Sequence, residues 1–174
     1  MNLNLQSSDF ELFQLPEQFA QDRPRIDARW KELQREVHPD KFAAQGAAAQ
    51  RVAMQWSVRV NEAYQRLREP LKRAAYLCER QGAPIEAESN TAMPADFLME
   101  QMAWREALDE ADTPEDLDSL QEQLARARKD TLERIGHLLD EAGDPGGAAK
   151  QVRALMFIER FAHDVEARFD LLGQ

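Results

Sequence analysis

The sequence predicts an all-α protein with two helical halves, and three observations carry this prediction. Apolar residues recur at spacings of three and four along most of the 174 residues, and no stretch shows a convincing strand-like alternation. Prolines and glycines fall at the ends of these helical patterns, where they start and stop helices. Residues 83–94 contain two prolines and no apolar stripe, so we interpret them as a linker between the halves.

The N-terminal half, residues 1–82, is predicted to contain an antiparallel helical hairpin. A short first helix is expected over residues 9–15. The next helix starts near Pro24 and ends at Pro39, because a residue that precedes proline disfavours the helical conformation. A long helix follows Gly46, and the short loop between the two long helices makes them antiparallel. Their apolar stripes are Ile26, Trp30, Leu33 and Val37 in one helix and Ala53, Trp56, Val60, Ala63 and Leu67 in the other.

The remaining helices are marked by proline starts and glycine stops. A helix from Pro70 to Gly82 completes the N-terminal half. The C-terminal half, residues 95–174, is predicted to be a three-helix bundle, because its connections are short. Its second and third helices begin at Thr-Pro and Asp-Pro pairs, in which the first residue caps the helix. The three helices are expected over residues 95–111, 113–142 and 144–172.

Composition excludes several classes of function. A net charge of −10 argues against general nucleic-acid binding, and no apolar run approaches the roughly 18 residues of a membrane-spanning helix. Cys78 is the only cysteine, so we predict neither an internal disulfide nor a cysteine metal cluster and interpret it as a small apolar helix residue. The N-terminal residues lack the features of a signal peptide, so a cytoplasmic location is expected.

Charge is divided unevenly between the two halves. Residues 1–80 hold 13 Lys and Arg against 11 Asp and Glu, a net charge of +2. Residues 81–174 hold 9 against 21, a net charge of −12. This asymmetry indicates that the two halves have different partners.

The tripeptide His38-Pro39-Asp40 falls at the exposed end of the predicted hairpin. One interpretation is a hydrolase or metal enzyme that uses His38 and Asp40, but the other two histidines lie in distant helices and no known catalytic or metal-binding motif is present. A second interpretation is a simple helix stop. The third is a recognition surface, because a stiff proline between an imidazole and a carboxylate loses little entropy on docking. We favour the third and predict no catalytic residue and no metal ligand.

The helix before this tripeptide carries basic residues on the side opposite its apolar stripe. These are Arg25, Lys31 and Arg35, and Lys41 follows just after the tripeptide. An ordinary solvated face explains them equally well. The alternative is electrostatic docking to an acidic partner protein, which mainly accelerates encounter.

The helix predicted over residues 95–111 has two apolar faces. Phe97, Trp104, Leu108 and Ala111 form the stripe that should face the bundle core. Opposite this stripe stand Leu98, Met99 and Met102, beside Glu106, Asp109 and Glu110. A helix of a small bundle needs only one buried face, so the second cluster packs on the other half of the chain or binds a partner. Methionines suit an adaptable binding surface.

The last helix shows the same pattern. Its core stripe is Leu155, Ile158, Ala162, Val165, Phe169 and Leu172. Met156 and Phe157 are predicted to point away from this stripe. Spacing alone leaves both explanations, packing and partner binding, open.

Four segments carry a family resemblance. QREVHPDKF, NEAYQRL, EPLKRAAYL and FLMEQMAWREALDE resemble the HscB-type co-chaperones of iron–sulfur cluster assembly, and the resemblance covers nearly the whole chain. It implies that the N-terminal half is a J domain, which docks on an HscA-like, DnaK-class ATPase chaperone and stimulates ATP hydrolysis. It also implies that the C-terminal bundle binds the IscU-like scaffold on which clusters are built. The chain is similar to bacterial members, because it lacks the N-terminal cysteine motif and targeting sequence common in eukaryotic ones.

The resemblance also implies roles for individual residues. Chaperone binding is expected of Arg25, Lys31, Arg35, His38, Pro39, Asp40 and Lys41. Scaffold binding is expected of Leu98, Met99, Met102, Glu106, Glu110 and Phe157. No enzymatic activity, cofactor or bound metal is implied. The alternative is a general J-domain co-chaperone whose C-terminal half binds a different client.

Overall fold

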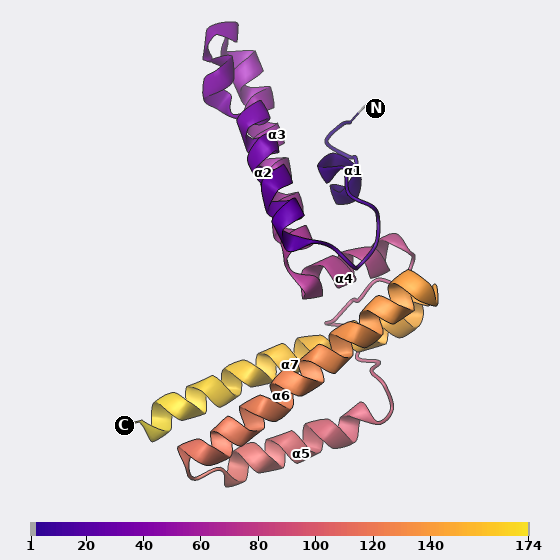
Figure 1. The fold of residues 1–174 in the computed structure, drawn as a ribbon, viewed down its shortest axis with the longest axis vertical. Coiled ribbons are helices and arrows are strands. Elements are labelled where there is room, and N and C mark those ends of the chain that lie inside the picture. The colour runs from indigo at the N-terminus through magenta and orange to yellow at the C-terminus, as the bar shows by residue number, and fades with distance from the viewer. Residues whose placement is uncertain (1–2, 174) are drawn as a thin grey trace. The chain divides into compact units, whose positions relative to one another are not determined.

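The structure is a computed structural model that describes residues 3–173, and every regular element in this range is helical (Figure 1). The predicted all-α class is confirmed. The chain forms two compact units, Met1–Leu77 and Cys78–Gln174. Their division falls inside helix α4 (Pro70–Arg80), and the segment 83–94 after it contains no helix. The predicted boundaries of the J domain, the linker and the scaffold-binding domain stay a prediction.

The N-terminal unit is built around an antiparallel hairpin of α2 and α3, on which the short helix α1 packs (Figure 1). A 3-10 helix, η1, follows α2 and packs on α3. The predicted start of α2 beside Pro24 is confirmed, because that proline stands in its first turn. The bounds are Asp9–Phe13 for α1, Arg23–Val37 for α2, Pro39–Gln45 for η1 and Ala47–Arg68 for α3.

The two predicted apolar stripes face each other across the hairpin. Ile26 and Val60 are fully buried there. Trp30 of α2 stacks on Tyr64 of α3, with ring centroids 4.6 Å apart. Its indole N–H donates a hydrogen bond of 3.0 Å to the Asn61 side-chain oxygen. An aromatic pair with a satisfied indole N–H fixes the register of the two helices.

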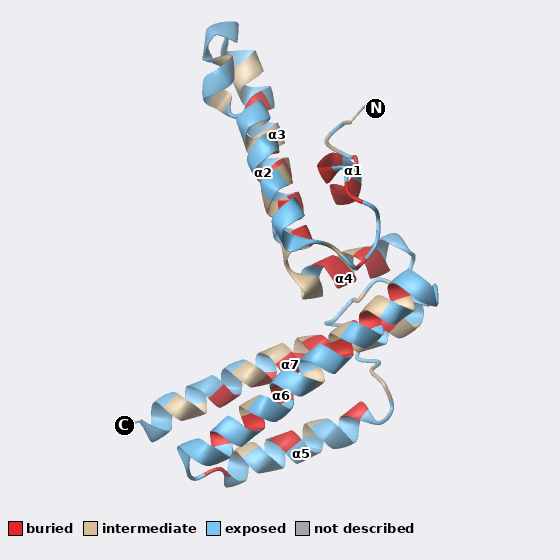
Figure 2. Cartoon of the chain, in the orientation of Figure 1, coloured by how far each residue is buried: buried red, intermediate tan, exposed pale blue. Residues whose placement is uncertain are grey.

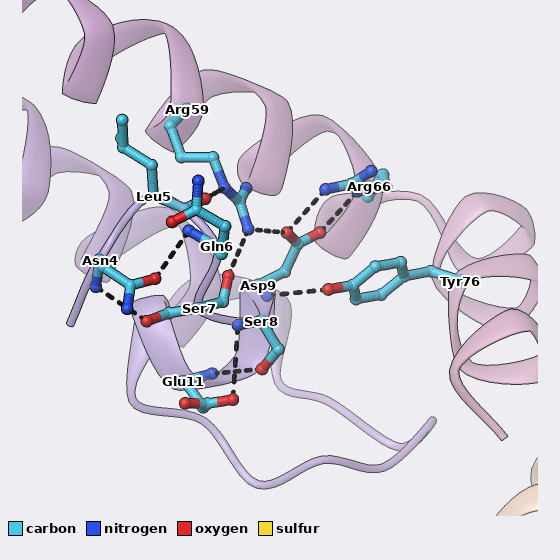
Figure 3. A network of polar contacts seen from close by, with 10 residues as sticks. All are labelled: Asn4, Leu5, Gln6, Ser7, Ser8, Asp9, Glu11, Arg59, Arg66 and Tyr76. Atoms are coloured by element: carbon cyan, nitrogen blue, oxygen red, sulfur yellow. Dashed lines mark hydrogen bonds and ion pairs between the residues drawn. The ribbon is translucent and has the colours of Figure 1, made fainter. Parts of the chain in front are cut away.

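Helix α1 is held on α3 by a buried carboxylate (Figure 3). Ser8 and Glu11 form a capping box that starts the helix. Asp9, which has no exposed surface, accepts two hydrogen bonds from Arg66, of 2.7 and 2.8 Å, and pairs with Arg59 at 2.8 Å. The backbone N–H of Asp9 donates to the Tyr76 hydroxyl at 3.0 Å. A charge buried so completely is stable only because both its oxygens are paired.

The C-terminal unit contains three helices, as predicted. Thr113 caps α6 through a capping box with Asp116, and Asp144 caps α7 by accepting from the Gly147 backbone N–H. Gly143 takes the left-handed conformation (φ 61°) that ends the preceding helix. The bounds are Phe97–Glu110 for α5, Pro114–Gly136 for α6 with a π-helical turn over His137–Glu141, and Pro145–Leu172 for α7.

Helix α7 is the centre of this unit, and its packing corrects one sequence prediction. Phe157 was predicted to point away from the core; this is wrong, because its side chain is only 9% exposed. It meets Phe97 of α5 edge to face, with centroids 5.8 Å apart, and stacks on Phe161. Side chains of α7 reach α5 through the ring pairs Phe97–Phe157 and Trp104–Phe161, and α6 packs along the same helix, so the buried arc of α7 is wider than one stripe. The buried residues of α7 are red in Figure 2. Met156 is half-buried.

The segment between α4 and α5 is tied to α7 by Arg153, which is 6% exposed. Its guanidinium donates to the carbonyl oxygens of Ile85, Ala92 and Pro84 at 3.0, 2.9 and 3.4 Å. Cys78, which the sequence indicates to be a small apolar helix residue, lies in α4 and is buried. Burial raises the pKa of the Cys78 thiol to about 11.

Candidate functional site

The connection between α2 and α3 presents His38, Pro39 and Asp40 at the end of the hairpin. His38 has extended backbone angles (φ −61°, ψ 130°), as expected for a residue that precedes proline. Its Nδ1 accepts a hydrogen bond of 3.2 Å from the Asp40 backbone N–H. The side chains of His38 and Asp40 are 57% and 94% exposed. This corner therefore holds an imidazole and a carboxylate out into solvent, two residues apart.

The hydrogen bond to Nδ1 assigns the tautomer of His38. A ring nitrogen that accepts a hydrogen bond carries no proton, so the proton lies on Nε2. Asp40 Oδ2 lies 3.7 Å from Nδ1, but an ion pair there requires a proton on Nδ1 and loses the hydrogen bond. The shorter contact, which satisfies a backbone donor, is the one that fixes the orientation of the ring. The corner then offers an N–H donor beside a carboxylate acceptor.

Four basic side chains lie before and after this corner. All four are exposed, and none forms an ion pair within residues 3–173. Their predicted orientation toward solvent is confirmed; their role in binding stays a prediction. They are Arg25, Lys31 and Arg35 of α2 and Lys41 of η1.

The second candidate surface is on α5. Leu98, Met99 and Met102 are 62%, 76% and 63% exposed, and we call these three residues the α5 apolar surface. Their predicted position outside the core is confirmed, because Phe97 and Trp104 are the buried residues of this helix. Large apolar side chains gathered on one exposed face mark an interaction site. The acidic residues Glu106, Asp109 and Glu110 follow on the same helix and are also exposed.

Residues 93–166 match the family model described as the HSCB C-terminal oligomerisation domain. The proteins named co-chaperone protein HscB homolog of Burkholderia thailandensis and Burkholderia multivorans are 49% and 50% identical to this chain over 173 residues. Each alignment covers 98% of this chain and 98% of the relative. The chain belongs to the HscB family of co-chaperones.

Solved structures of HscB proteins have the same fold. The chaperone HscB from Vibrio cholerae is 34% identical, with a TM-score of 0.80 over 95% of this chain and 99% of that one. Human co-chaperone protein HscB is 23% identical, with a TM-score of 0.87 over 95% and 84% of the two chains, and shows the fold alone. This HscB-family chain is thus a J-domain co-chaperone of iron–sulfur cluster assembly, with an N-terminal J domain and a C-terminal helical bundle.

In this HscB-family chain, the predicted site residues fall into three groups. The residues predicted to bind the chaperone lie on α2, on η1 and at the corner between them. The α5 apolar surface, Glu106 and Glu110 share one helix. Phe157 stands apart, because it lies in the core cluster and not on the exposed face.

The competing interpretation, a hydrolase or metal enzyme, requires a site that shields the reacting groups from water. His38 and Asp40 stand on the open end of a hairpin, where no wall excludes water from a reacting group. Within residues 3–173, no group of three or more His, Cys, Asp or Glu is placed to hold a metal ion. No helix in the same range is long and apolar enough to cross a membrane.

Sequence reasoning missed two charged residues that shape this HscB-family chain. Asp9 anchors α1, and Arg153 anchors the segment before α5. Neither residue stands in a motif that marks it as buried, and charged residues are rarely buried unless paired. The nearest signal is the position of Asp9 after a capping serine, which predicts the helix start but not the partners.

Proposed function

We propose that this chain stimulates ATP hydrolysis by an HscA-like chaperone and delivers an IscU-like scaffold to it. One observation carries the proposal: two exposed surfaces of opposite chemistry lie on separate units. A polar, basic surface is on the N-terminal unit, and an apolar surface with acidic neighbours is on the C-terminal one. The chaperone hydrolyses ATP in its own active site, and this chain supplies neither a cofactor nor a catalytic residue. Its setting is the cytoplasm.

The N-terminal surface suits the ATPase. His38, Pro39 and Asp40 press on the chaperone as a rigid unit, which loses little conformational entropy on binding. Arg25, Lys31, Arg35 and Lys41 attract an acidic face of the chaperone. Since these four form no ion pair within the described residues, no internal contact must break first.

The C-terminal surface suits the scaffold. Leu98, Met99 and Met102 supply apolar area, and the flexible thioethers adapt to the partner. Glu106 and Glu110 favour a scaffold face that carries Lys or Arg. Phe157 also contributes, although it is buried in the free chain.

Because both surfaces are on one chain, binding of the scaffold is coupled to stimulation of ATP hydrolysis by the chaperone. Scaffold and chaperone meet at a raised effective concentration, so hydrolysis is stimulated when a client is present. The decisive experiment is steady-state ATP hydrolysis by an HscA-like chaperone with and without this chain and the scaffold. We expect synergistic stimulation that His38→Gln and Asp40→Asn abolish, with scaffold binding and circular dichroism unchanged.

Other outcomes of that assay discriminate between the interpretations. Stimulation that is indifferent to the scaffold would favour the general J-domain co-chaperone with a different client. If the His38→Gln variant still stimulates ATP hydrolysis fully, the tripeptide is better interpreted as a simple helix stop. Activity of the isolated chain on ATP or another substrate would restore the enzyme interpretation.

Scaffold binding is tested separately by calorimetry. Met99→Ala is expected to weaken binding by about 1–2 kcal/mol, which is usual for an interface residue of intermediate importance. Met54→Ala is the matched control, because Met54 is a methionine of similar exposure, 58%, on the other unit. Equal affinities for the two variants would contradict the assignment of the α5 apolar surface to the scaffold.

A further inference from the structure

Phe157 lines a groove between α5 and α7, where the guanidinium of Arg105 lies over its ring. The groove has a volume of about 290 Å³. Its floor is aromatic, because Phe157 and Phe161 stack with centroids 5.7 Å apart. The Arg105 guanidinium carbon lies 5.4 Å from the centroid of the Phe157 ring. With this cation–π contact in place, Phe157 is 9% exposed.

Arg105 is held over the ring weakly. Four exposed charged residues stand on the rims of the groove, Arg105 and Asp109 on α5 and Arg160 and Asp164 on α7. Within residues 3–173, none of the four forms an ion pair. The guanidinium of Arg105 is thus held in place by its cation–π contact with the Phe157 ring. Such contacts are weak at exposed sites. The side chain can swing away at little cost.

The groove continues the α5 apolar surface. Leu98, Met102, Arg105 and Asp109 follow at spacings of four, three and four, so they share one face of the helix. A partner that lies along Leu98 and Met102 meets Arg105 next. If Arg105 stays in place, Phe157 offers this partner almost no surface.

We propose that Arg105 is a movable cover, and that an apolar side chain of the scaffold replaces it on the Phe157 ring. This inference rests on the proposed function. The aromatic floor selects an aliphatic or aromatic side chain, and Glu106 and Glu110 select a scaffold segment in which Lys or Arg flanks it. The displaced Arg105 pairs with Asp109, one turn further along α5. Phe157 thereby binds the scaffold although it is buried in the free chain.

The test is calorimetry of the scaffold with the full chain and four variants: Arg105→Ala, Arg160→Ala, Phe157→Leu and the double variant Arg105→Ala/Phe157→Leu. Arg105→Ala is expected to tighten binding by about two- to fivefold, because the cost of lifting the cation off the ring disappears. Arg160→Ala is the matched control, since it removes the same charge from the same groove but uncovers nothing. Titrations at about 0.5 M salt, where the Debye length is about 4 Å, suppress the general effect of charge. Phe157→Leu should erase the gain from Arg105→Ala, because the two substitutions are then coupled.

A second measurement uses the unaltered chain, so that it does not depend on the stability of a core variant. With labelled phenylalanine, NMR should detect contacts between the Phe157 ring and scaffold methyl groups in the complex. If the Phe157 ring signal stays unchanged when the chain is saturated with scaffold, the proposal that Arg105 is a movable cover is wrong. It is also wrong if Arg105→Ala and Arg160→Ala bind the scaffold with the same affinity. If Met99→Ala still weakens binding in that case, the proposed function stands and only the cover is wrong. A scaffold that does not bind at all overturns both.

Discussion

Replacing Asp9 with alanine tests how far one buried carboxylate stabilises the J domain. Its two oxygens accept hydrogen bonds from Arg66 at 2.7 and 2.8 Å, and Arg59 lies 2.8 Å away (Figure 3). The substitution leaves two guanidinium groups facing each other without the anion between them. Loss of one partner from a buried ion pair costs about 3–5 kcal/mol.

The structure indicates a smaller loss of stability than this for Asp9→Ala. The Arg66 side chain is 40% exposed, so water rehydrates it when Asp9 is removed. Arg59 is 13% exposed and keeps two backbone carbonyl acceptors. The Asp9 backbone N–H also keeps its bond to Tyr76. We therefore expect the free energy of unfolding of the N-terminal unit to fall by about 2–4 kcal/mol.

Hydrogen exchange followed by mass spectrometry in increasing urea measures the two units separately. In Asp9→Ala, peptides of α1 and α3 should lose protection, whereas those of α6 and α7 should not. Asp118→Ala, which removes an exposed aspartate of α6, is the control. A loss below about 0.5 kcal/mol, the range of ordinary surface substitutions, would refute the argument that these ion pairs stabilise the fold. An equal loss in both units would refute its restriction to the N-terminal one.

Three further predictions follow from the charges and the buried thiol. Arg35→Glu should slow association with the chaperone severalfold at low salt and less at high salt, whereas Lys129→Glu on the other unit should not; equal rates in stopped-flow fluorescence would exclude steering. Arg153→Met leaves three carbonyl groups without their hydrogen-bond donor. The amides between α4 and α5 should then exchange faster, and the free energy of unfolding should fall by about 2 kcal/mol. Unchanged exchange would show that the guanidinium does not hold the segment. Burial raises the pKa of the Cys78 thiol from 9.0 to about 11, so iodoacetamide at pH 8 should label this residue only after unfolding. The contribution of the thiol to stability is complete below pH 9 and disappears as the pH rises through 11. Fast labelling of the native chain would contradict this.

Much of the fold could be predicted because its signals are local. The Thr113 capping box, the proline after Asp144 and the positive φ of Gly143 each act within one turn of helix, so the sequence alone marks these ends. The stripes of α2 and α3 needed only the helical period, because each helix buries one face. The exposure of Leu98, Met99 and Met102 followed from the same rule: α5 lies at the side of the bundle and has one face to bury.

The site was less accessible to such reasoning wherever two or more elements meet. A single apolar stripe on α7 excludes Phe157, because one stripe serves one neighbouring helix, whereas α7 contacts two helices and buries ten residues. The ion pairs of Asp9 join residues fifty or more positions apart, and no local pattern indicates them. The same holds for Arg153, whose acceptors are backbone carbonyls that any residue type provides.

The sequence by itself determined the all-α class, most helix ends, the exposed His38-Pro39-Asp40 corner and the family. These properties depend on capping, period and residue identity, which act over one or two helical turns. Only the tertiary structure decided which charged groups are buried, how wide an arc of α7 is covered, and that Arg105 rather than solvent lies over Phe157. Those properties depend on which helices become neighbours, and that is set by the packing of the whole unit.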